Sequence, residues 1–334
     1  MLKLIENEVI KMVFKKKLML ITGILLILIM LFSYGENYTY KNTISRFSKA
    51  TGQTQNYDWK LLVKQQISDL KTRLNSPYIQ ESNKNSVNIQ IEQLEYYIDN
   101  NINPITPGAA KFTVKFMQQA VFMFLPLLII ILAGDSVSGE FSTRTIKVLL
   151  TRSVPRWKVL LSKYIALLIL STIVILETAL ISILVSGIMF QNFGWNEPVA
   201  TGFKVISGKL DSTNVVRVFE WQYIILIYSL GWFVANTIAT ISFMVSVLVR
   251  NTSTSIGIMM AALIGGSFLQ FFLTDWPLVK YFFVININLP QYLTGSFQPI
   301  NGMSLVFSSL VLGAWSITAL IISFLVFNKQ DVLV

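Results

Sequence analysis

The sequence contains no cysteine and no histidine among its 334 residues. Without cysteine, the chain has no disulfide bond, no thiolate nucleophile and no cysteine-ligated metal site. Without histidine, it lacks the commonest metal ligand and a frequent general base, so neither Ser-His-Asp nor Cys-His catalysis can be built from it. We therefore predict that the chain is not an enzyme and that it binds no cofactor or metal of its own.

Charged residues are also scarce. They make up 13% of the chain, whereas hydrophobic residues make up 53%. A soluble domain of this length rarely carries so few charges, and long apolar runs point to a membrane protein. The 27 Lys and Arg outnumber the 17 Asp and Glu, but they flank apolar runs. There they orient the spans and meet anionic lipid headgroups, so we expect a lipid bilayer rather than nucleic acid as the partner.

The apolar runs predict an all-α polytopic membrane protein with six transmembrane helices and both termini in the cytoplasm, placed in a bacterial cell membrane. Residues 1–17 are typical of an interfacial amphipathic helix, residues 134–163 form a basic inner segment, and residues 328–334 form an inner tail. The six predicted spans are residues 18–34, 114–133, 164–190, 221–249, 255–273 and 303–327.

The remaining segments are predicted to lie outside the cell. Residues 35–113 are polar and contain two amphipathic patterns, at 58–74 and 87–98, which predict a small helical hairpin. The hairpin is either a spacer or a lid that meets the substrate. Residues 191–220 are predicted to be a loop. Residues 274–302 contain an apolar stretch, 277–293, that is too short and too broken by Pro290 to span, so we expect a re-entrant or interfacial helix there.

The segment 134–163 is the most informative part of the chain. Several apolar residues in it, from Ile146 to Trp157, recur at spacings of three and four, which predicts an amphipathic helix. Glu140 precedes this pattern and basic residues crowd its later turns, as the helix dipole favours. An ordinary basic loop that obeys the positive-inside rule explains the pattern equally well.

The residues of this segment resemble a signature that follows the second span in type-2 ABC exporter permeases, the transmembrane subunits of bacterial drug and antimicrobial-peptide exporters. In that family an acidic residue leads into Gly-Thr, Leu-Leu, Pro-x-x-Arg and a Lys that opens the third span. This sequence departs twice, with Arg144 at the usual glycine and Ser153 at the usual proline. The matching residues are Glu140, Thr145, Leu149, Leu150, Arg156 and Lys163.

The resemblance implies a permease subunit that pairs with a second one, as a homodimer or a related heterodimer, and with two separate ABC ATPase subunits. Those ATPase subunits would bind the ATP and Mg. ATP-driven closure would push on this segment and move an amphiphilic drug, antimicrobial peptide or lipid-like substrate out of the cell. The implied ATPase-coupling residues are Glu140, Arg144, Thr145, Leu149, Leu150, Arg152, Pro155, Arg156 and Lys163.

Three features within the spans are candidates for a role in transport. In relatives of this layout the second and fifth spans line the path, which makes Phe122, Phe124, Gly265 and Phe268 candidate wall residues. Glu177 lies in the middle of the third span, where a carboxyl must face protein or water; it either holds two helices together or contacts the substrate. A small-residue face for helix packing or a dimer seam is formed by Gly257, Ala261 and Gly265.

Two functions of other classes stay open. A channel or an ion-coupled secondary transporter would use Glu177 as its coupling carboxylate, although such carriers usually gather several polar groups at the midplane. A membrane sensor would bind an extracellular peptide with the outer hairpin, but it would need a separate signalling partner. A nucleotide site is not expected, because Gly202 and Gly208 are spaced wrongly for a P-loop and Leu210 occupies the required Ser or Thr position.

Overall fold

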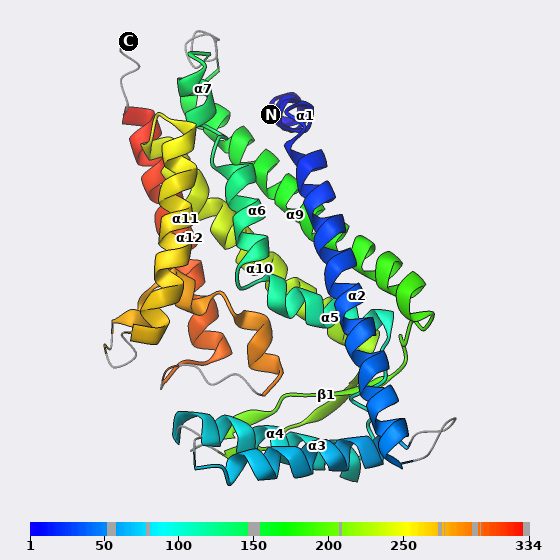
Figure 1. The fold of residues 1–334 in the computed structure, drawn as a ribbon. Helices are drawn as coiled ribbons and strands as arrows, with labels where there is room; N and C mark the ends of the chain where they lie inside the picture. Colours follow the sequence, from blue (N-terminus) through cyan, green and yellow to red (C-terminus); the bar gives the residue numbers. More distant parts are fainter. Residues whose placement is uncertain are drawn as a thin grey trace.

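The computed structural model describes residues 1–51, 58–77, 81–145, 154–206, 209–272, 276, 278–295, 300 and 302–329. Long helices run between two ends of the molecule (Figure 1). Five of the described helices are long and apolar enough to cross a membrane, and six if a bent pair counts as one span. The chain is therefore a predominantly helical membrane protein.

Two of the candidate spans, α2 (Lys17–Thr51) and α9 (Arg156–Phe190), are longer than the apolar runs alone indicate. Helices of 35 residues, such as α2 and α9, are about 52 Å long and exceed a hydrocarbon core of about 30 Å. Accordingly, α9 begins before residue 164, the start of the predicted third span. The helices are α2 (Lys17–Thr51), α9 (Arg156–Phe190), α10 (Glu220–Leu248), α11 (Thr252–Phe272) and α12 (Leu305–Lys329), with the bent pair α5 (Ala109–Ala120) and α6 (Phe124–Ala133).

The second predicted span, residues 114–133, is wrong as a single continuous helix. Its two halves, α5 and α6, are bent by 64° at residues 121–123. Pro126 explains the position of the break, because its ring has no N–H to donate and clashes with the carbonyl of residue 122 in a continuous helix. Beyond the break the chain resumes as α6, with Pro126 in its first turn.

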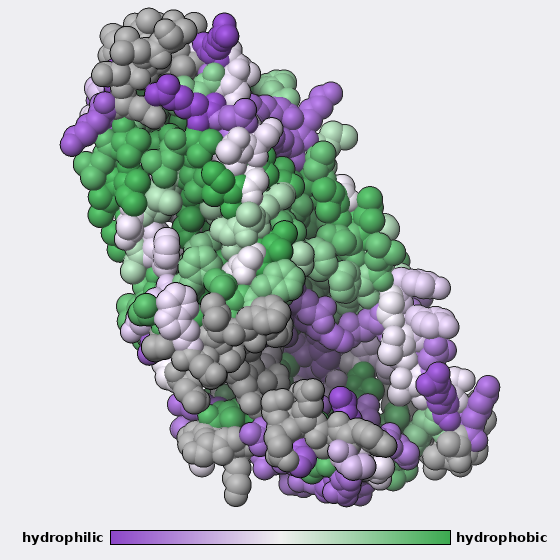
Figure 2. Space-filling view, turned by 60° about the vertical axis from the view of Figure 1, so that its left-hand side comes forward, coloured by the Kyte–Doolittle hydropathy of each residue, from purple (hydrophilic) through white to green (hydrophobic). Residues whose placement is uncertain are grey.

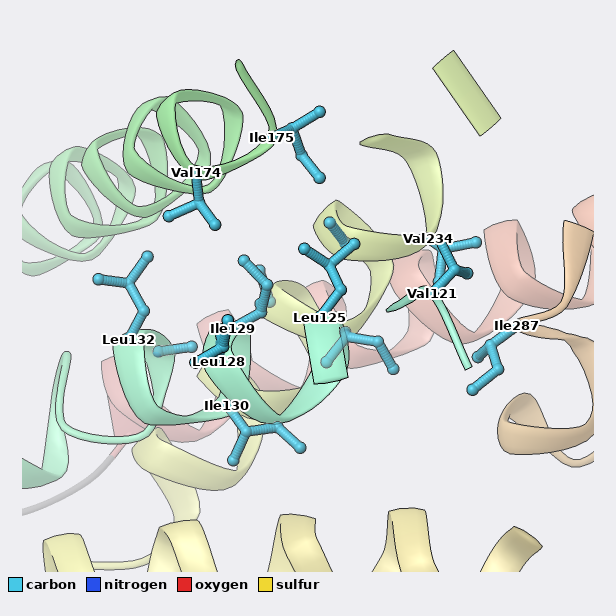
Figure 3. Packing of buried hydrophobic residues seen from close by; sticks show 14 of the residues in the cluster. Val121, Leu125, Leu128, Ile129, Ile130, Leu132, Val174, Ile175, Val234 and Ile287 are labelled. Carbon is cyan, nitrogen blue, oxygen red and sulfur yellow. The ribbon is translucent and has the colours of Figure 1, made fainter. Parts of the chain in front are cut away.

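The main hydrophobic core surrounds α6. Leu125, Ile129 and Leu132 of α6 belong to one buried cluster with Val174 of α9 and Val234 of α10, and Figure 3 shows Leu132 pointing toward Val174. These side chains are almost fully buried. On the outer face of α9, by contrast, the apolar side chains are exposed. They recur every four residues, as expected for a helix surface that meets lipid. That face is formed by Leu176, Leu180, Leu184 and Ile188, and a broad hydrophobic surface is visible in Figure 2.

A short-turn segment follows α11 where a re-entrant or interfacial helix is predicted. The described part of it forms three 3-10 turns rather than one helix: η1 (Val279–Tyr281), η2 (Phe283–Asn286) and η3 (Leu289–Leu293). Two of its backbone carbonyls accept hydrogen bonds from side chains. Asn286 Nδ2 donates to Lys280 O at 2.8 Å, and Trp315 Nε1 donates to Tyr281 O at 2.9 Å. Irregular backbone beside spans is tolerated when protein groups satisfy it in this way.

One end of the molecule carries a helical hairpin and two β-ribbons. The hairpin helices α3 (Trp59–Leu74) and α4 (Glu81–Asp99) share a small core centred on Val63 and Ile91. The segment 191–220, predicted as a plain loop, contains strands. β1 (Pro198–Thr201) pairs antiparallel with β4 (Val216–Phe219), and β2 (Lys204–Ile206) with β3 (Lys209–Asp211). Phe203 contacts the rings of Tyr96 and Tyr97 edge-on, which fixes the ribbons to α4.

The other end carries α1 (Leu2–Phe14) and α7 (Ser138–Ser142). Figure 1 shows α1 almost along its axis while α2 runs down the page, so α1 lies across the end of the helical bundle. The C-terminal end of α12 lies at this same end, opposite α3 and α4. Both ends of the described chain are therefore on one side of the bundle.

Candidate functional site

The candidate site is a charged cluster at the α1–α7 end. Two acidic residues lie after α6: Asp135, two residues beyond its end, and Glu140, within α7. Both form ion pairs with α1, α2 or α9, or with the residues that join α1 to α2. A third acid and four lysines come from those helices. We call the whole group the charged cluster: Glu8, Lys11, Lys15, Lys17, Asp135, Glu140 and Lys163.

Glu140 and Lys163 form the buried centre of the charged cluster. Their side chains are 3% and 1% exposed, and Lys163 Nζ donates to Glu140 Oε1 at 2.5 Å. Lys163 Nζ also pairs with Glu8 Oε2 at 2.9 Å, and Lys11 Nζ pairs with the same Glu140 Oε1 atom. Three helices, α1, α7 and α9, are thus tied together by one carboxylate and one ammonium group. Removing either charge leaves its partner in an environment of low polarity.

Charge pairing outweighs burial in the charged cluster. Burial alone would raise the pKa of Glu140, but the ammonium groups of Lys163 and Lys11 hold that pKa below its ordinary value of 4.5. Burial would lower the pKa of Lys11, but Glu140 raises that pKa above 10.5. The stability from Glu140 is therefore present above pH 4.5 and lost as the pH falls through its lowered pKa. That from Lys11 is present below pH 10.5 and lost as the pH rises through its raised pKa, so both persist near neutral pH.

Asp135 attaches the α1–α2 elbow to the end of α6. Its two oxygens pair with Lys15 Nζ at 2.7 Å and with Lys17 Nζ at 3.0 Å. Lys17 Nζ also bonds to Ile131 O at 3.1 Å. Between these lysines, Lys16 adopts a left-handed backbone conformation (φ +56°) that turns the chain from α1 into α2. Movement of α1 is therefore coupled to the segment after α6.

The short helix α7 is also held from the turn between α10 and α11. Ser246 Oγ of α10 accepts hydrogen bonds from the backbone N–H groups of Val137 and Ser138, at 3.1 and 3.0 Å. Such bonds satisfy donors that a helix N-terminus leaves unpaired. On the other side, the Arg250 guanidinium lies 5.8 Å from the ring centroid of Phe141. Helix α7 is thus fixed on several sides although it has only five residues.

The end of α7 explains the departure at Arg144. Thr145 N donates to Glu140 O at 3.0 Å and Arg144 N donates to Phe141 O at 3.1 Å, the pair of bonds of a Schellman turn. Arg144 occupies the left-handed position of this turn, with φ +57°. Glycine is favoured there because it has no Cβ. The glycine expected from the resemblance therefore falls on a residue of this chain that adopts the left-handed conformation.

This geometry predicts the effect of exchanging Arg144. Arg144→Gly and Arg144→Ala both remove the charged side chain, but only glycine relieves the left-handed backbone. We expect Arg144→Gly to be more stable than Arg144→Ala by about 1 kcal/mol. Thermal unfolding of the two purified variants in the same detergent measures the difference, and equal midpoints would contradict the assigned turn.

The structure divides the predicted ATPase-coupling residues into two groups. Glu140 and Lys163 are buried, so they cannot present a surface to a partner and act instead through the contacts described above. Arg144, Thr145 and Pro155 are exposed, and Arg156 is partly buried. Leu149, Leu150 and Arg152, with most of the predicted amphipathic helix, lie outside the described residues.

The candidate path residues are dispersed. Phe124 lies edge-on to Phe32 of α2 with ring centroids 5.9 Å apart, and Phe122 lies partly buried in the break between α5 and α6. Glu177 Oε2 accepts a hydrogen bond from Thr22 Oγ1 at 2.8 Å, which joins α9 to α2. This contact favours the interpretation of Glu177 as a carboxyl that holds two helices together.

The small-residue face of α11 is not used for packing inside the described chain. A Cβ added at Gly257 or Gly265 meets no atom within 4 Å, and Ala261 and Phe268 on the same face are exposed. The glycine that does pack is the neighbour Gly266, which contacts Phe282 and Val284. The face is therefore free for lipid or for a second subunit.

Sequence reasoning missed the members of the charged cluster other than Glu140 and Lys163, namely Glu8, Lys11, Lys15, Lys17 and Asp135. One signal was present: Asp135 is an acid placed two residues after an apolar run. The role of Asp135 depends on which lysines pair with it, and the tertiary fold determines those partners.

Comparison with known proteins gives relatives whose function is not described. A family model described as "Protein of unknown function (DUF2705)" matches residues 79–333. The uncharacterized protein YhcI of Bacillus subtilis (strain 168) is 29% identical over 341 residues, which cover 99% of each chain. The uncharacterized membrane protein YdbK of the same organism is 26% identical over 216 residues, covering 63% of this chain and 78% of the relative. The name of the second agrees with a membrane location.

Proposed function

The chain belongs to the DUF2705 family of proteins of unknown function, and we propose that it is the transmembrane subunit of an ATP-driven ABC exporter in the bacterial cell membrane, powered by separate ATPase subunits. In this proposal the bent pair α5–α6 counts as one of six spans. Both termini and the charged cluster face the cytoplasm, and α3, α4 and the β-ribbons lie outside. ATP and Mg bind the partner subunits.

The observation that carries the proposal is the way in which α7 is held. The exposed turn at Arg144 and Thr145 projects from a helix that is tied to α1 and α9 by ion pairs and to α10 by Ser246. A push on the turn by a soluble subunit therefore reaches several helices at once. Because sliding these helices apart would separate the buried Lys163 from Glu8 and Glu140, the elements should move together.

A second subunit fits the exposed face of α11. The smooth surface at Gly257, Ala261 and Gly265 allows close approach of another helix, and Phe268 continues it toward the outer end. We propose that two permease subunits meet along this face, as a homodimer or a related heterodimer. An amphiphilic substrate would pass between them when the spans tilt.

An ion-coupled carrier remains the main alternative and would need Glu177 to exchange protons or ions. The bond from Thr22 to Glu177 supports a structural role instead. No groups of three or more acidic side chains suited to hold a metal ion occur in the parts of the chain that the structure describes. The exporter is therefore the function that the geometry supports best.

The topology behind this proposal can be measured because the chain has no cysteine. Single cysteines are introduced at Ser68 on α3 and at Thr143 beside the turn of α7, both exposed positions. A membrane-impermeant maleimide should label Ser68→Cys in intact cells and Thr143→Cys only after permeabilisation. The reverse labelling pattern would place the charged cluster outside the cell, where a cytoplasmic ATPase cannot reach it, and would contradict the proposal.

A further inference from the structure

A cavity of about 350 Å³ lies between the outer layer and the ends of the spans. Its walls come from α4, from residues 102–108, from β1, from α5 and from the first turn of α10, together with Glu36 of α2, Phe190 of α9 and Thr294. Figure 2 shows a hydrophilic recess between the hydrophobic body and the layer opposite α1. The volume is within the range of small-ligand sites in proteins.

One carboxyl in this cavity lacks a partner. Glu220, the first residue of α10, is 2% exposed and lines the cavity. Its Oε2 atom is buried and has no hydrogen-bond partner among the described residues. A buried polar atom without a partner is destabilising, and a buried charge more so, so a ligand that supplies a donor there removes this penalty when it binds.

The other charges of the cavity are already compensated. Lys111 Nζ is held by Glu197 Oε2 at 2.7 Å and by Asn103 O at 2.8 Å. Lys115 Nζ is held by Glu36 Oε1 at 3.0 Å. Two amides are used as well, since Gln118 Nε2 donates to Tyr223 Oη at 3.2 Å and Gln93 Nε2 donates to Thr294 O at 2.7 Å. Glu220 is the acid of this group without a basic side chain paired to it.

The remaining walls suit a cation with an apolar body. Aromatic rings line the cavity, and their faces attract ammonium groups. Apolar side chains lie beside them and can cover a hydrocarbon tail. The rings belong to Tyr97, Phe112, Phe190 and Tyr223.

We propose that this cavity binds a cationic amphiphile, with the ammonium group bonded to Glu220 and the tail against the aromatic and apolar walls. Calling the ligand a transported substrate rests on the proposed function, but its binding to the chain does not. A charge-assisted bond to a carboxylate is about twice as strong as a neutral one, so the site prefers a cation to an alcohol of the same length.

The test is calorimetric titration of the full chain in lipid nanodiscs, with protein-free nanodiscs subtracted and no ATPase present. The probes are octylammonium, octanol and octanoate, which share one tail. Wild-type protein should bind octylammonium at least tenfold more tightly than octanol, and octanoate least. Equal affinity for the three probes, or a preference for octanoate, would overturn the proposal without any variant.

Glu220→Gln tests the residue itself. It should weaken octylammonium binding at least tenfold and leave octanol binding unchanged, which also shows that the variant is folded. Glu95→Gln is the matched control, because Glu95 is exposed on α4 and pairs with Lys71 away from the cavity. If Glu220→Gln binds octylammonium as the wild type does, the assigned counter-ion is wrong. The two proposals can fail separately. Loss of the predicted octylammonium binding says nothing about ATPase docking, and loss of ATPase docking does not affect octylammonium binding.

Discussion

Glu140→Gln is expected to lower the free energy of unfolding by about 3 kcal/mol, because it leaves the 1% exposed ammonium group of Lys163 without its closest counter-ion. Glu8 remains as a partner at 2.9 Å, which keeps the loss at the lower end of the range for broken buried pairs. Lys11 is 41% exposed and can turn to water, so it adds little to the loss. Unfolding of the purified chain in mixed micelles measures the change.

The matched control for this exchange is Glu95→Gln. Glu95 pairs with Lys71 at 2.9 Å, but the two side chains are 48% and 56% exposed, so the expected loss is under about 1 kcal/mol. The double variant Glu140→Gln with Lys163→Met should regain part of the stability, because it removes the stranded charge as well. A single-variant loss no larger than that of the control would show that the buried pair does not hold α7 to α9.

Gly266→Ala is expected to cost about 1–3 kcal/mol, since the new methyl group would lie 2.7 Å from Val284 Cβ and 2.8 Å from Phe282 Cε1. Both neighbours belong to the short-turn segment that packs between α11 and α12. Gly265→Ala is the control on the same helix, where the methyl group meets no atom within 4 Å. It should be neutral, or more stable by up to about 1 kcal/mol, because alanine is the better helix former.

The same pair of variants separates packing within the chain from packing between subunits. Unfolding midpoints compare the two glycines, and size-exclusion chromatography with light scattering reports the oligomeric state. Gly265→Ala should leave the fold intact, and replacing Gly265 by tryptophan should weaken a dimer formed along this face. Equal destabilisation by the two alanine exchanges would contradict the orientation of α11.

The membrane class could be predicted from the sequence because long uninterrupted apolar runs are typical of membrane-spanning helices. The amphipathic pattern at 58–74 likewise coincides with α3 (Trp59–Leu74), because apolar residues spaced three or four positions apart lie on one face of a helix, and that face is buried. The break at residues 121–123 was missed although Pro126 signalled it. The residues on both sides of the break are apolar, so the hydropathy of the run does not show where the helix is interrupted. The two β-ribbons were missed because their strands have only three or four residues each.

The candidate site could be located but not resolved from the sequence. Glu140 and Lys163 were singled out by their register in the segment, but their further partners Glu8 and Lys11 come from α1, which is more than a hundred residues away in the chain. Arg144 was noted as a departure, and its left-handed backbone explains why glycine is the expected residue. Glu220 gave no signal, because its burial depends on how the outer layer covers α10.

The most direct test of the proposed function is co-purification of the tagged full chain from bacterial membranes, with mass spectrometry of the proteins that remain bound. We expect an ABC ATPase subunit with the wild type and with Lys64→Glu, an exposed charge reversal on α3 at the opposite end. Arg144→Glu, in the exposed turn after α7, should lose the ATPase while the chain stays folded. Recovery of the wild-type chain without any ATPase, or equal recovery of the ATPase with Arg144→Glu, would contradict the account.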